Sequence, residues 1–360
     1  MRLARIVLGR RSPAGLVGAV LTRDVSIAGH HWAKGRRLSA DDLEALGSPE
    51  AVATSARSGL GGPARTASIS VILLEPGDVH EDDAALRLAH AVAGPGLVLR
   101  GPAQSRVDLL AETDGVAHVR VGALERLNRI DPLEVFTVFD GQVVSAGDLV
   151  ASVKVAPHVV AGSVLERGER VAVRRGPLVR VAPFLRRRIG VVVKESLPQQ
   201  ARERFEQSVR QKVEGLGSEV ASVRYVEDDE VALELALAVY ARGPGRVDVV
   251  LTAGAGSTDP ADPLFVALAR VGGRIVRRGV PAHPGSMLWL GRIGRTIILG
   301  LPTCGAYSKA TAADLLLPRL LSGEPPGPGT VARLGHGGIL SRSMRFRFPP
   351  YARELEAPEG

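Results

Sequence analysis

From residue 189 to residue 322 the chain alternates apolar strands with amphipathic helices, and this alternation constrains the fold more than any other feature. The strand-like segments include "IGVVVKES" (189–196), "SEVASVRYV" (218–226) and "VDVVLTAG" (247–254), and a segment with helical spacing of apolar residues follows each. Continuous apolar strands are typical of parallel sheets that are buried on both faces. The pattern therefore predicts a three-layer α/β/α domain with a mostly parallel sheet.

The N-terminal half shows a different pattern, in which short strands and turns predominate. We predict a β-rich α+β region over 1–186, with a break near 48–68 that would divide it into two subdomains. The α/β domain is predicted over 187–325, and a basic tail with a β-like pattern over 326–360. Residues 167–188 carry eight arginines and are predicted to be a strand or linker whose arginines form a solvated face.

Composition excludes several classes of protein. The net charge of +8 would suit a nucleic-acid partner, but aromatic residues are only 4% and are not interleaved with the basic ones. A single cysteine, Cys304, rules out an intramolecular disulfide and a cysteine-based zinc site. The N-terminus has no long apolar core, and no stretch approaches the roughly 20 apolar residues of a membrane span. We therefore expect a cytoplasmic protein with no membrane partner, and the composition disfavours a nucleic-acid partner.

The segment "TAGAGSTDPADP" (252–263) is a glycine-rich turn between a strand and a helix, which is a natural place to bind an anion. The N–H and hydroxyl donors would come from Gly254, Gly256, Ser257 and Thr258. A tight turn with positive φ explains the glycines equally well. Asp259 and Asp262 would repel a phosphate, unless they share a Mg²⁺ ion with it or accept hydrogen bonds from N–H groups of the ligand. Simple capping of the following helix is the alternative.

Two later loops leave the same predicted sheet, and loops at the carboxyl ends of parallel strands commonly bind ligands. They are the segment around "HPGS" (283–286) and the turn "GLPTCGAYSK" (300–309). The candidate ligand-binding residues in them are Gly285, Ser286, Pro302, Thr303, Cys304, Gly305, Ser308 and Lys309. His283 is equally an exposed loop residue, Cys304 a small buried one, and Lys309 either a solvated lysine or a counter-ion for a ligand phosphate.

These motifs resemble a known family. Residues 189–322 look like the molybdopterin-binding domain shared by molybdopterin molybdotransferases and adenylyltransferases. The resemblance rests on the order and spacing of "TAGAGSTDPAD", "LARVGGRIVRRGVPAHPGSMLWLGRIG" and "TIILGLPTCGAYS". A bacterial subgroup of molybdopterin-binding proteins, some of them fused to cofactor nucleotidyltransferases, is more similar still. Its last turn carries a cysteine, as Cys304 does here, and its N-terminal region contains a segment like "LEPGDV" (74–79).

The resemblance implies that the ligand is molybdopterin or molybdenum cofactor, and that the protein acts in the biosynthesis or handling of that cofactor. It further implies Asp259 and Asp262 as catalytic residues that place a Mg²⁺ ion, or as contacts of the pterin. A molybdoenzyme or a cofactor-biosynthesis protein would be the partner, and fold relatives suggest a homo-oligomer.

Three departures from the family pattern leave the activity open. Lys194, Glu195 and Ser196 stand where the family has a "TGDEL"-like turn, Ala253 breaks a double glycine, and Thr303 replaces a glycine. The chain is therefore interpreted either as a molybdotransferase or nucleotidyltransferase, or as a non-catalytic carrier. A further alternative is a scaffold of the same fold that has lost the ligand and uses its arginine-rich face for protein or nucleic-acid contact.

Overall fold

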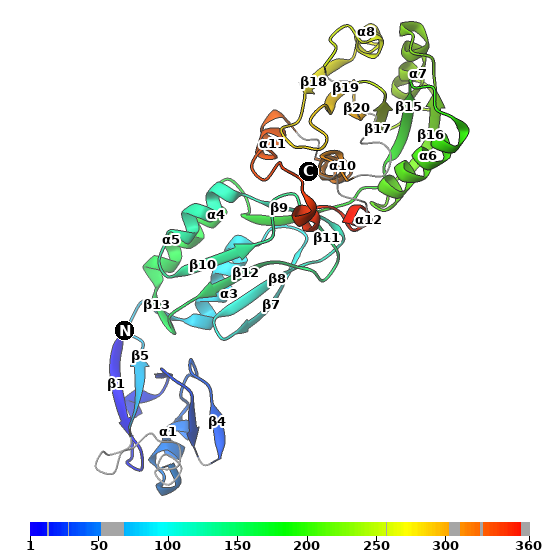
Figure 1. The fold of residues 1–360 in the computed structure, drawn as a ribbon. Helices are drawn as coiled ribbons and strands as arrows, with labels where there is room; N and C mark the ends of the chain where they lie inside the picture. The colour runs from blue at the N-terminus through cyan, green and yellow to red at the C-terminus, as the bar shows by residue number, and fades with distance from the viewer. Residues whose placement is uncertain are drawn as a thin grey trace. The chain divides into compact units, whose positions relative to one another are not determined.

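The computed structural model divides the chain, drawn in Figure 1, into two compact units. The first comprises Met1–Ala111, Val119–Val138 and Leu149–Arg180, and the second comprises Glu112–His118, Phe139–Asp148 and Val181–Gly360. The structure describes residues 1–12, 14–27, 29–51, 68–256, 258–301, 310–324 and 327–353. Each unit has a hydrophobic core of its own.

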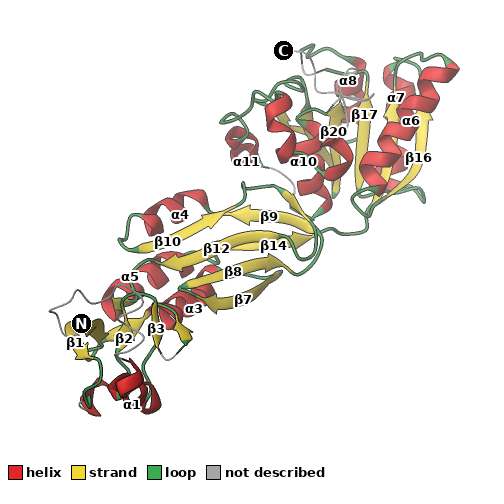
Figure 2. Ribbon diagram, turned by 60° about the horizontal axis from the view of Figure 1, so that its bottom comes forward, coloured by secondary structure: helices red, strands yellow, loops and turns green. Residues whose placement is uncertain are grey.

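A six-stranded sheet forms the centre of the second unit (Figure 2). Its strands are β15 (Arg188–Val193), β16 (Glu219–Tyr225), β17 (Val249–Ala253), β18 (Arg274–Arg278), β19 (Trp289–Ile293) and β20 (Thr296–Leu301). Their order is β16-β15-β17-β20-β19-β18, and the first four are parallel to one another. Only β19 runs against its neighbours, so the prediction of a mostly parallel sheet is confirmed.

Helices cover both faces of this sheet. Those on one face are α6 (Gln199–Glu214) and α10 (Ala313–Leu321), and those on the other are α7 (Glu230–Arg242) and α8 (Pro263–Arg270). Successive residues of β15 point to opposite faces, so that Val191 and Val193 pack under α6 and α10 whereas Val192 packs under α7 and α8. This arrangement confirms the three-layer α/β/α fold, and it explains why the strand is apolar throughout.

The C-terminal segment forms short helices and not the β-like structure expected from its sequence. These helices are α11 (Pro328–Arg333), η2 (Arg342–Arg347) and α12 (Pro350–Arg353). Pro328 and Pro350 stand at the first positions of their helices, where the missing N–H of proline costs nothing. Val331, Leu340 and Phe348 are buried in the same core as α6 and α10, so the described part of this segment is integral to the second unit.

The first unit is β-rich with helices packed on its sheets, as predicted. A small antiparallel sheet contains β1 (Arg2–Val7), β5 (Ser68–Leu73) and β2 (Val20–Leu21), and a hairpin joins β3 (Val25–Ile27) to β4 (His30–Trp32). A larger antiparallel sheet contains β10 (Leu133–Thr137), β12 (Leu149–Val155), β8 (Arg106–Ala111) and β7 (Leu97–Ala103). The remaining elements include α1 (Ala40–Gly47), β6 (Asp78–His80), α3 (Glu81–Val92), α4 (Val121–Asn128), β13 (Val159–Ala161) and α5 (Gly162–Val173). A further three-stranded sheet lies mostly in the second unit. Its strands are β9 (Gly115–Val119), β11 (Val143–Val144) and β14 (Val179–Pro183).

The arginine-rich segment is partly helical, and the prediction of a strand through its first residues was wrong. Residues up to Val173 form the second half of α5, which buries Leu165, Gly168 and Ala172 at helical spacing. A Cβ atom at Gly168 would overlap the end of the Leu133 side chain, so the close approach of the helix to Leu133 favours glycine at this position. In the described part of the chain, no helix combines the length and apolar character needed to span a bilayer.

Candidate functional site

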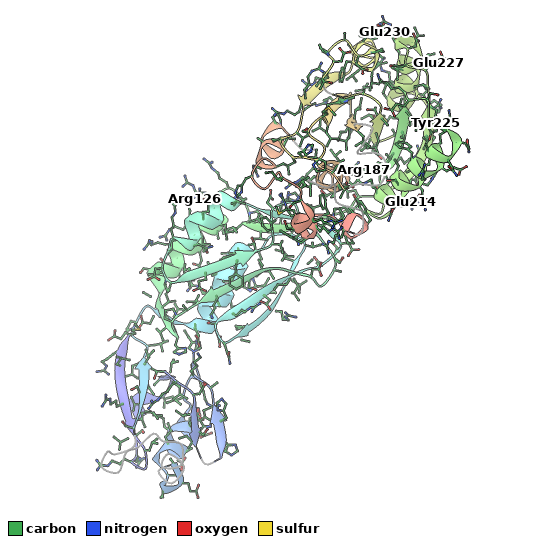
Figure 3. The ribbon with its side chains drawn as sticks, in the orientation of Figure 1. Arg126, Arg187, Glu214, Tyr225, Glu227 and Glu230 are labelled. Atoms are coloured by element: carbon green, nitrogen blue, oxygen red, sulfur yellow. The ribbon has the colours of Figure 1, made fainter. Side chains whose placement is uncertain are left out.

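The candidate site lies at the carboxyl edge of the six-stranded sheet, beside β15. The chain runs from β15 through α6 to β16 on one side, and then through α7 to β17 on the other side. Such a reversal opens a crevice at the ends of the two central strands, and ligands of open α/β sheets bind in crevices of this kind. Tyr225 and Glu227, both labelled in Figure 3, mark the position where β16 ends at this edge.

The glycine turn begins directly after β17. Gly254 has a φ of +101°, and a Cβ atom there would lie 2.8 Å from the Cγ atoms of both Lys194 and Glu195. Backbone conformation and close packing therefore both require glycine at this position. Gly256 is different, because a Cβ atom there would meet nothing nearer than Thr258 Oγ1 at 3.7 Å. Architecture alone thus explains Gly254 but leaves the glycine at 256 unexplained.

A buried tryptophan binds the backbone of the glycine turn. Trp289 of β19 donates a hydrogen bond from Nε1 to the carbonyl oxygen of Ala255, at 3.1 Å. Its indole lies against Gly300 of β20, where any side chain would collide with it, and it contacts Phe265 edge-on with ring centroids 5.0 Å apart. Sequence reasoning missed Trp289, although one of only two tryptophans in an aromatic-poor chain is a signal of its own.

The two acids of the turn have distinct local partners. Asp259 is exposed and accepts a hydrogen bond from the Ala261 N–H at 2.8 Å, which closes a short turn of the backbone. Asp262 is buried and is the N-cap of α8, where Oδ1 accepts from the Leu264 N–H at 2.9 Å. The capping alternative is therefore the one that the contacts of Asp262 fit directly.

Lys194, which follows β15, binds the other oxygen of Asp262. Its Nζ lies 2.8 Å from Asp262 Oδ2 and 2.9 Å from Asp228 Oδ1, and the lysine side chain is only 6% exposed. Burial by itself lowers the pKa of Lys194, but the hydrogen bonds and charges of Asp262 and Asp228 outweigh burial and raise it above the ordinary value. The ammonium group is thus held in its charged form at the edge of the site.

This set of donors does not fit a Mg²⁺ ion. Asp262 uses one oxygen for the helix cap and the other for Lys194, so its carboxylate is not available to a metal without breaking an ion pair. Among the residues that the structure describes, no three His, Cys, Asp or Glu side chains form a group that could hold a metal ion. Assignment of Asp259 and Asp262 as metal ligands or catalytic groups stays a prediction.

The "HPGS" loop comes close to the glycine turn. Gly285 has a φ of +108°, and a Cβ atom there would lie 2.9 Å from the Ala312 backbone nitrogen, so the loop packs tightly against the start of α10. The carbonyl of Ser286 accepts from the Val280 N–H at 2.9 Å. Met287 follows, with its sulfur 3.9 Å from where a Cβ atom of Gly256 would lie. The structure therefore brings the first two predicted loops together.

The third loop follows β20, which ends at Leu301 beside Ala253, the last residue of β17. The remaining candidates lie outside the described residues, as does Ser257 of the glycine turn. They are Pro302, Thr303, Cys304, Gly305, Ser308 and Lys309.

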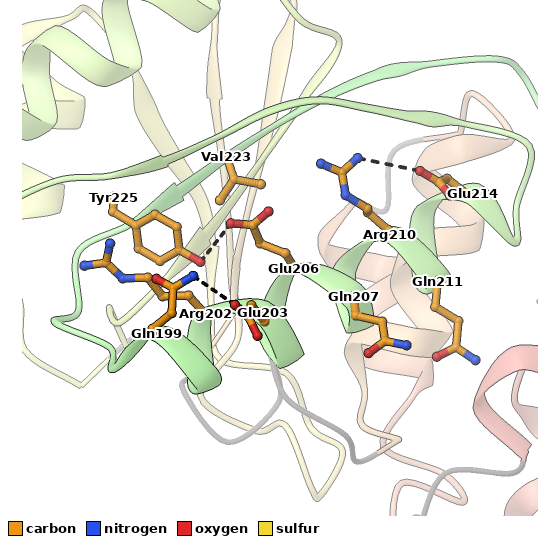
Figure 4. Close-up of a pocket in the computed structure, with 10 residues that line it drawn as sticks. All are labelled: Gln199, Arg202, Glu203, Glu206, Gln207, Arg210, Gln211, Glu214, Val223 and Tyr225. Carbon is orange, nitrogen blue, oxygen red and sulfur yellow. Dashed lines mark hydrogen bonds and ion pairs between the residues drawn. The ribbon is translucent and has the colours of Figure 1, made fainter.

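A wide groove runs along α6 and β16, from Tyr225 at the end of β16 to Glu214 at the end of α6 (Figure 4). Its polar side chains largely satisfy one another. The Tyr225 hydroxyl donates to Glu206 at 3.4 Å, Gln199 donates to Glu203 at 2.9 Å, and the Arg202 guanidinium stacks on the Tyr225 ring. These contacts are those of a solvated helix face, so we place the candidate site at the glycine turn and not in this groove.

The fold is an open α/β sheet, a class in which ligands commonly bind at the switch point of the sheet. Residues 189–322 match the family model described as "Probable molybdopterin binding domain". This match confirms the resemblance stated from the motifs, and it covers less than half of the chain. It supports a role in molybdenum cofactor biosynthesis.

Solved structures give weaker likenesses. The molybdopterin biosynthesis enzyme MoaB from Thermus thermophilus is 23% identical, with 39% of this chain and 98% of that chain covered and a TM-score of 0.28. The molybdopterin biosynthesis protein MoeA from Pyrococcus horikoshii is 15% identical, with 68% and 79% covered and a TM-score of 0.29. A search of curated proteins matched none. The assignment therefore rests on the family match.

Proposed function

We propose that this protein binds molybdopterin or molybdenum cofactor at the carboxyl edge of its second unit and acts in the biosynthesis or handling of that cofactor. The observation that carries the proposal is the family match over 189–322, which spans the glycine turn. Gly256 supports it, because this position needs no glycine for packing but would let an anion approach the backbone closely.

In this proposal the backbone N–H groups and hydroxyls of residues 254–258 bind the ligand phosphate. The loop that carries Ser286 and the turn that carries Cys304 approach the same ligand. Asp259 is exposed on the turn and accepts N–H groups of the pterin ring, which needs no metal. A cofactor-biosynthesis protein or a molybdoenzyme would receive the ligand from this chain.

The scaffold alternative is less well supported. It needs an arginine face free for a partner, yet several arginines of the 167–188 segment have acidic neighbours. Arg188 lies 3.6 Å from Glu219, and Arg187 lies 3.6 Å from Asp248. Exposed ion pairs of this kind contribute little to stability, but they lower the positive potential that a nucleic acid would require.

The test is an anaerobic titration of the full chain with molybdopterin, in which tryptophan fluorescence is the measured signal. A Trp32→Phe background leaves Trp289, which contacts the turn, as the only tryptophan. We expect saturable binding that Gly256→Val abolishes, because branched methyl groups would block the approach to the turn. The matched control is Gly329→Val, a glycine of α11 with no atom within 4 Å of its Cβ position.

Two outcomes would contradict the proposal: an absence of saturable binding up to tens of micromolar ligand, or equal binding by the Gly256→Val and Gly329→Val variants. When binding is present, turnover assays with molybdate and with nucleotide then separate a transferase from a carrier. Self-association is read from the mass of the same sample in solution.

A further inference from the structure

We propose that the ammonium group of Lys194 is a built-in cation, which occupies the position between Asp228 and Asp262 that a divalent metal would otherwise take. The site would then bind its anionic ligand without a metal ion. The statement about the ligand rests on the proposed function, whereas the statement about the cation concerns only residues of this chain.

Three separate elements converge on this position. Lys194 follows the central strand β15, Asp228 lies in the loop between β16 and α7, and Asp262 begins α8. The Nζ atom lies 2.9 Å from one carboxylate and 2.8 Å from the other. Mg²⁺ binds in proteins through one or two carboxylates and keeps several waters, so a pair of carboxylates that face one point is a cation site. In this protein the ammonium group of Lys194 occupies that point.

Stability alone gives no reason for such an arrangement. The pair with Asp262 is buried, whereas Asp228 is 54% exposed. A buried ion pair pays a desolvation cost that often cancels its Coulombic gain, and an exposed one contributes little. The position of Lys194 is instead defined by the site, since its Cγ lies against the Cβ position of Gly254 in the glycine turn. An ammonium at this point neutralises one of the two carboxylate charges where an anion is expected to bind, so that Lys194, Asp228 and Asp262 together carry a net charge of −1 instead of −2.

Lys212 provides an internal comparison. It is also a buried lysine of the second unit, with Nζ 2.6 Å from Asp314 Oδ1, but it lies between α6 and α10 and pairs with a single carboxylate. Removal of Lys212 therefore leaves one buried carboxylate away from the turn, whereas removal of Lys194 leaves two carboxylates around an empty position. The two substitutions separate the loss of a buried lysine from the opening of a cation site.

The experiment measures the binding of Mn²⁺ alone by electron paramagnetic resonance. Wild-type protein, Lys194→Ala and Lys212→Ala are titrated with Mn²⁺ at neutral pH. We expect Lys194→Ala to bind one Mn²⁺ at least about tenfold more tightly than the other two proteins, because two carboxylates lose their counter-charge. The double variant Lys194→Ala/Asp228→Asn should lose this gain, which assigns the new site to the Asp228–Asp262 pair.

The proposal is overturned if folded Lys194→Ala gains no Mn²⁺ site, or if wild-type protein binds Mn²⁺ as tightly as that variant. Circular dichroism checks that the variants fold. If Lys194→Ala fails to fold, the proposal is tested on wild-type protein, whose affinity for pterin is measured in EDTA and in Mg²⁺. An unchanged affinity supports a built-in cation, whereas an affinity about tenfold higher in Mg²⁺ refutes it. Failure of pterin to bind at all would refute the proposed function and leave the Mn²⁺ comparison to judge the cation.

Discussion

Substitution of Gly254 by alanine should destabilise the second unit far more than the same substitution at Gly256. The two glycines lie in one turn and are separated by a single residue. Gly254 has a positive φ and close neighbours on its Cβ side, whereas Gly256 has neither. The pair therefore tests whether the turn is built as the structure describes it.

The cost at Gly254 has two parts. An alanine in the left-handed region costs about 1–2 kcal/mol. The new methyl group would also lie 2.8 Å from the Cγ atoms of Lys194 and Glu195, and Lys194 cannot retreat without disturbing two ion pairs. Overpacking of this kind adds roughly 1–3 kcal/mol, while the lower entropy of the unfolded chain returns less than about 1 kcal/mol. A net loss of about 2–4 kcal/mol follows.

The assay is urea unfolding followed by the fluorescence of Trp289 in the Trp32→Phe background, because this tryptophan lies in the second unit and reports its transition separately. Gly254→Ala should lower the free energy of unfolding of this unit by the stated amount, and Gly256→Ala should change it by about 0.5 kcal/mol or less. Equal losses in the two variants, or a loss below about 1 kcal/mol at Gly254, would refute the reasoning.

Three further predictions concern other contacts. Trp289→Phe leaves the Ala255 carbonyl without its donor and should cost about 1–3 kcal/mol in urea unfolding, with weaker ligand binding. Asp108 is desolvated, but Ser152 and two arginines hold its pKa at about 2, so its contribution is present above pH 4 and is lost as the pH falls toward 2. The free energy of unfolding of the first unit should therefore fall between pH 4 and pH 2. In Asp108→Asn this fall should be smaller by roughly 2 kcal/mol. The raised pKa of Lys194 means that its contribution is complete below its ordinary value of 10.5 and is lost at higher pH, where wild type and Lys194→Ala should converge.

The sequence predicts the second unit well because its signals are local. Strands buried on both faces are apolar throughout, and helices that pack on them show helical spacing within a dozen residues. The caps are local too, since Asp229 and Asp262 each bind an N–H two residues further along the chain. Physical rules that act over a few residues are therefore enough to place β15, β17, α7 and α8.

The failures arise where the deciding contact is remote. In α5 the alternation of valine and arginine imitates a strand, but the segment is a helix whose buried face includes Gly168, which packs on Leu133, a residue 35 positions earlier in the chain. In the sequence Lys194 stands out only as a departure from a family pattern, because its two partners lie 34 and 68 residues away. No periodicity or motif reports contacts of this range, so only the structure shows the ion pairs.

The ion pairs also resolve the conflict within the glycine turn. A turn that binds an anion through its N–H groups should not carry two carboxylates, unless their charge is used elsewhere. The charge of Asp262 is divided between the α8 cap and Lys194, and Asp259 binds the backbone of its own loop. Coulombic repulsion depends on net charge. A carboxylate that is paired with a buried ammonium therefore repels an anionic ligand less than a free carboxylate would. The acids and the glycines are therefore compatible without a metal: the acids fix the shape of the turn, and Gly256 leaves its backbone open.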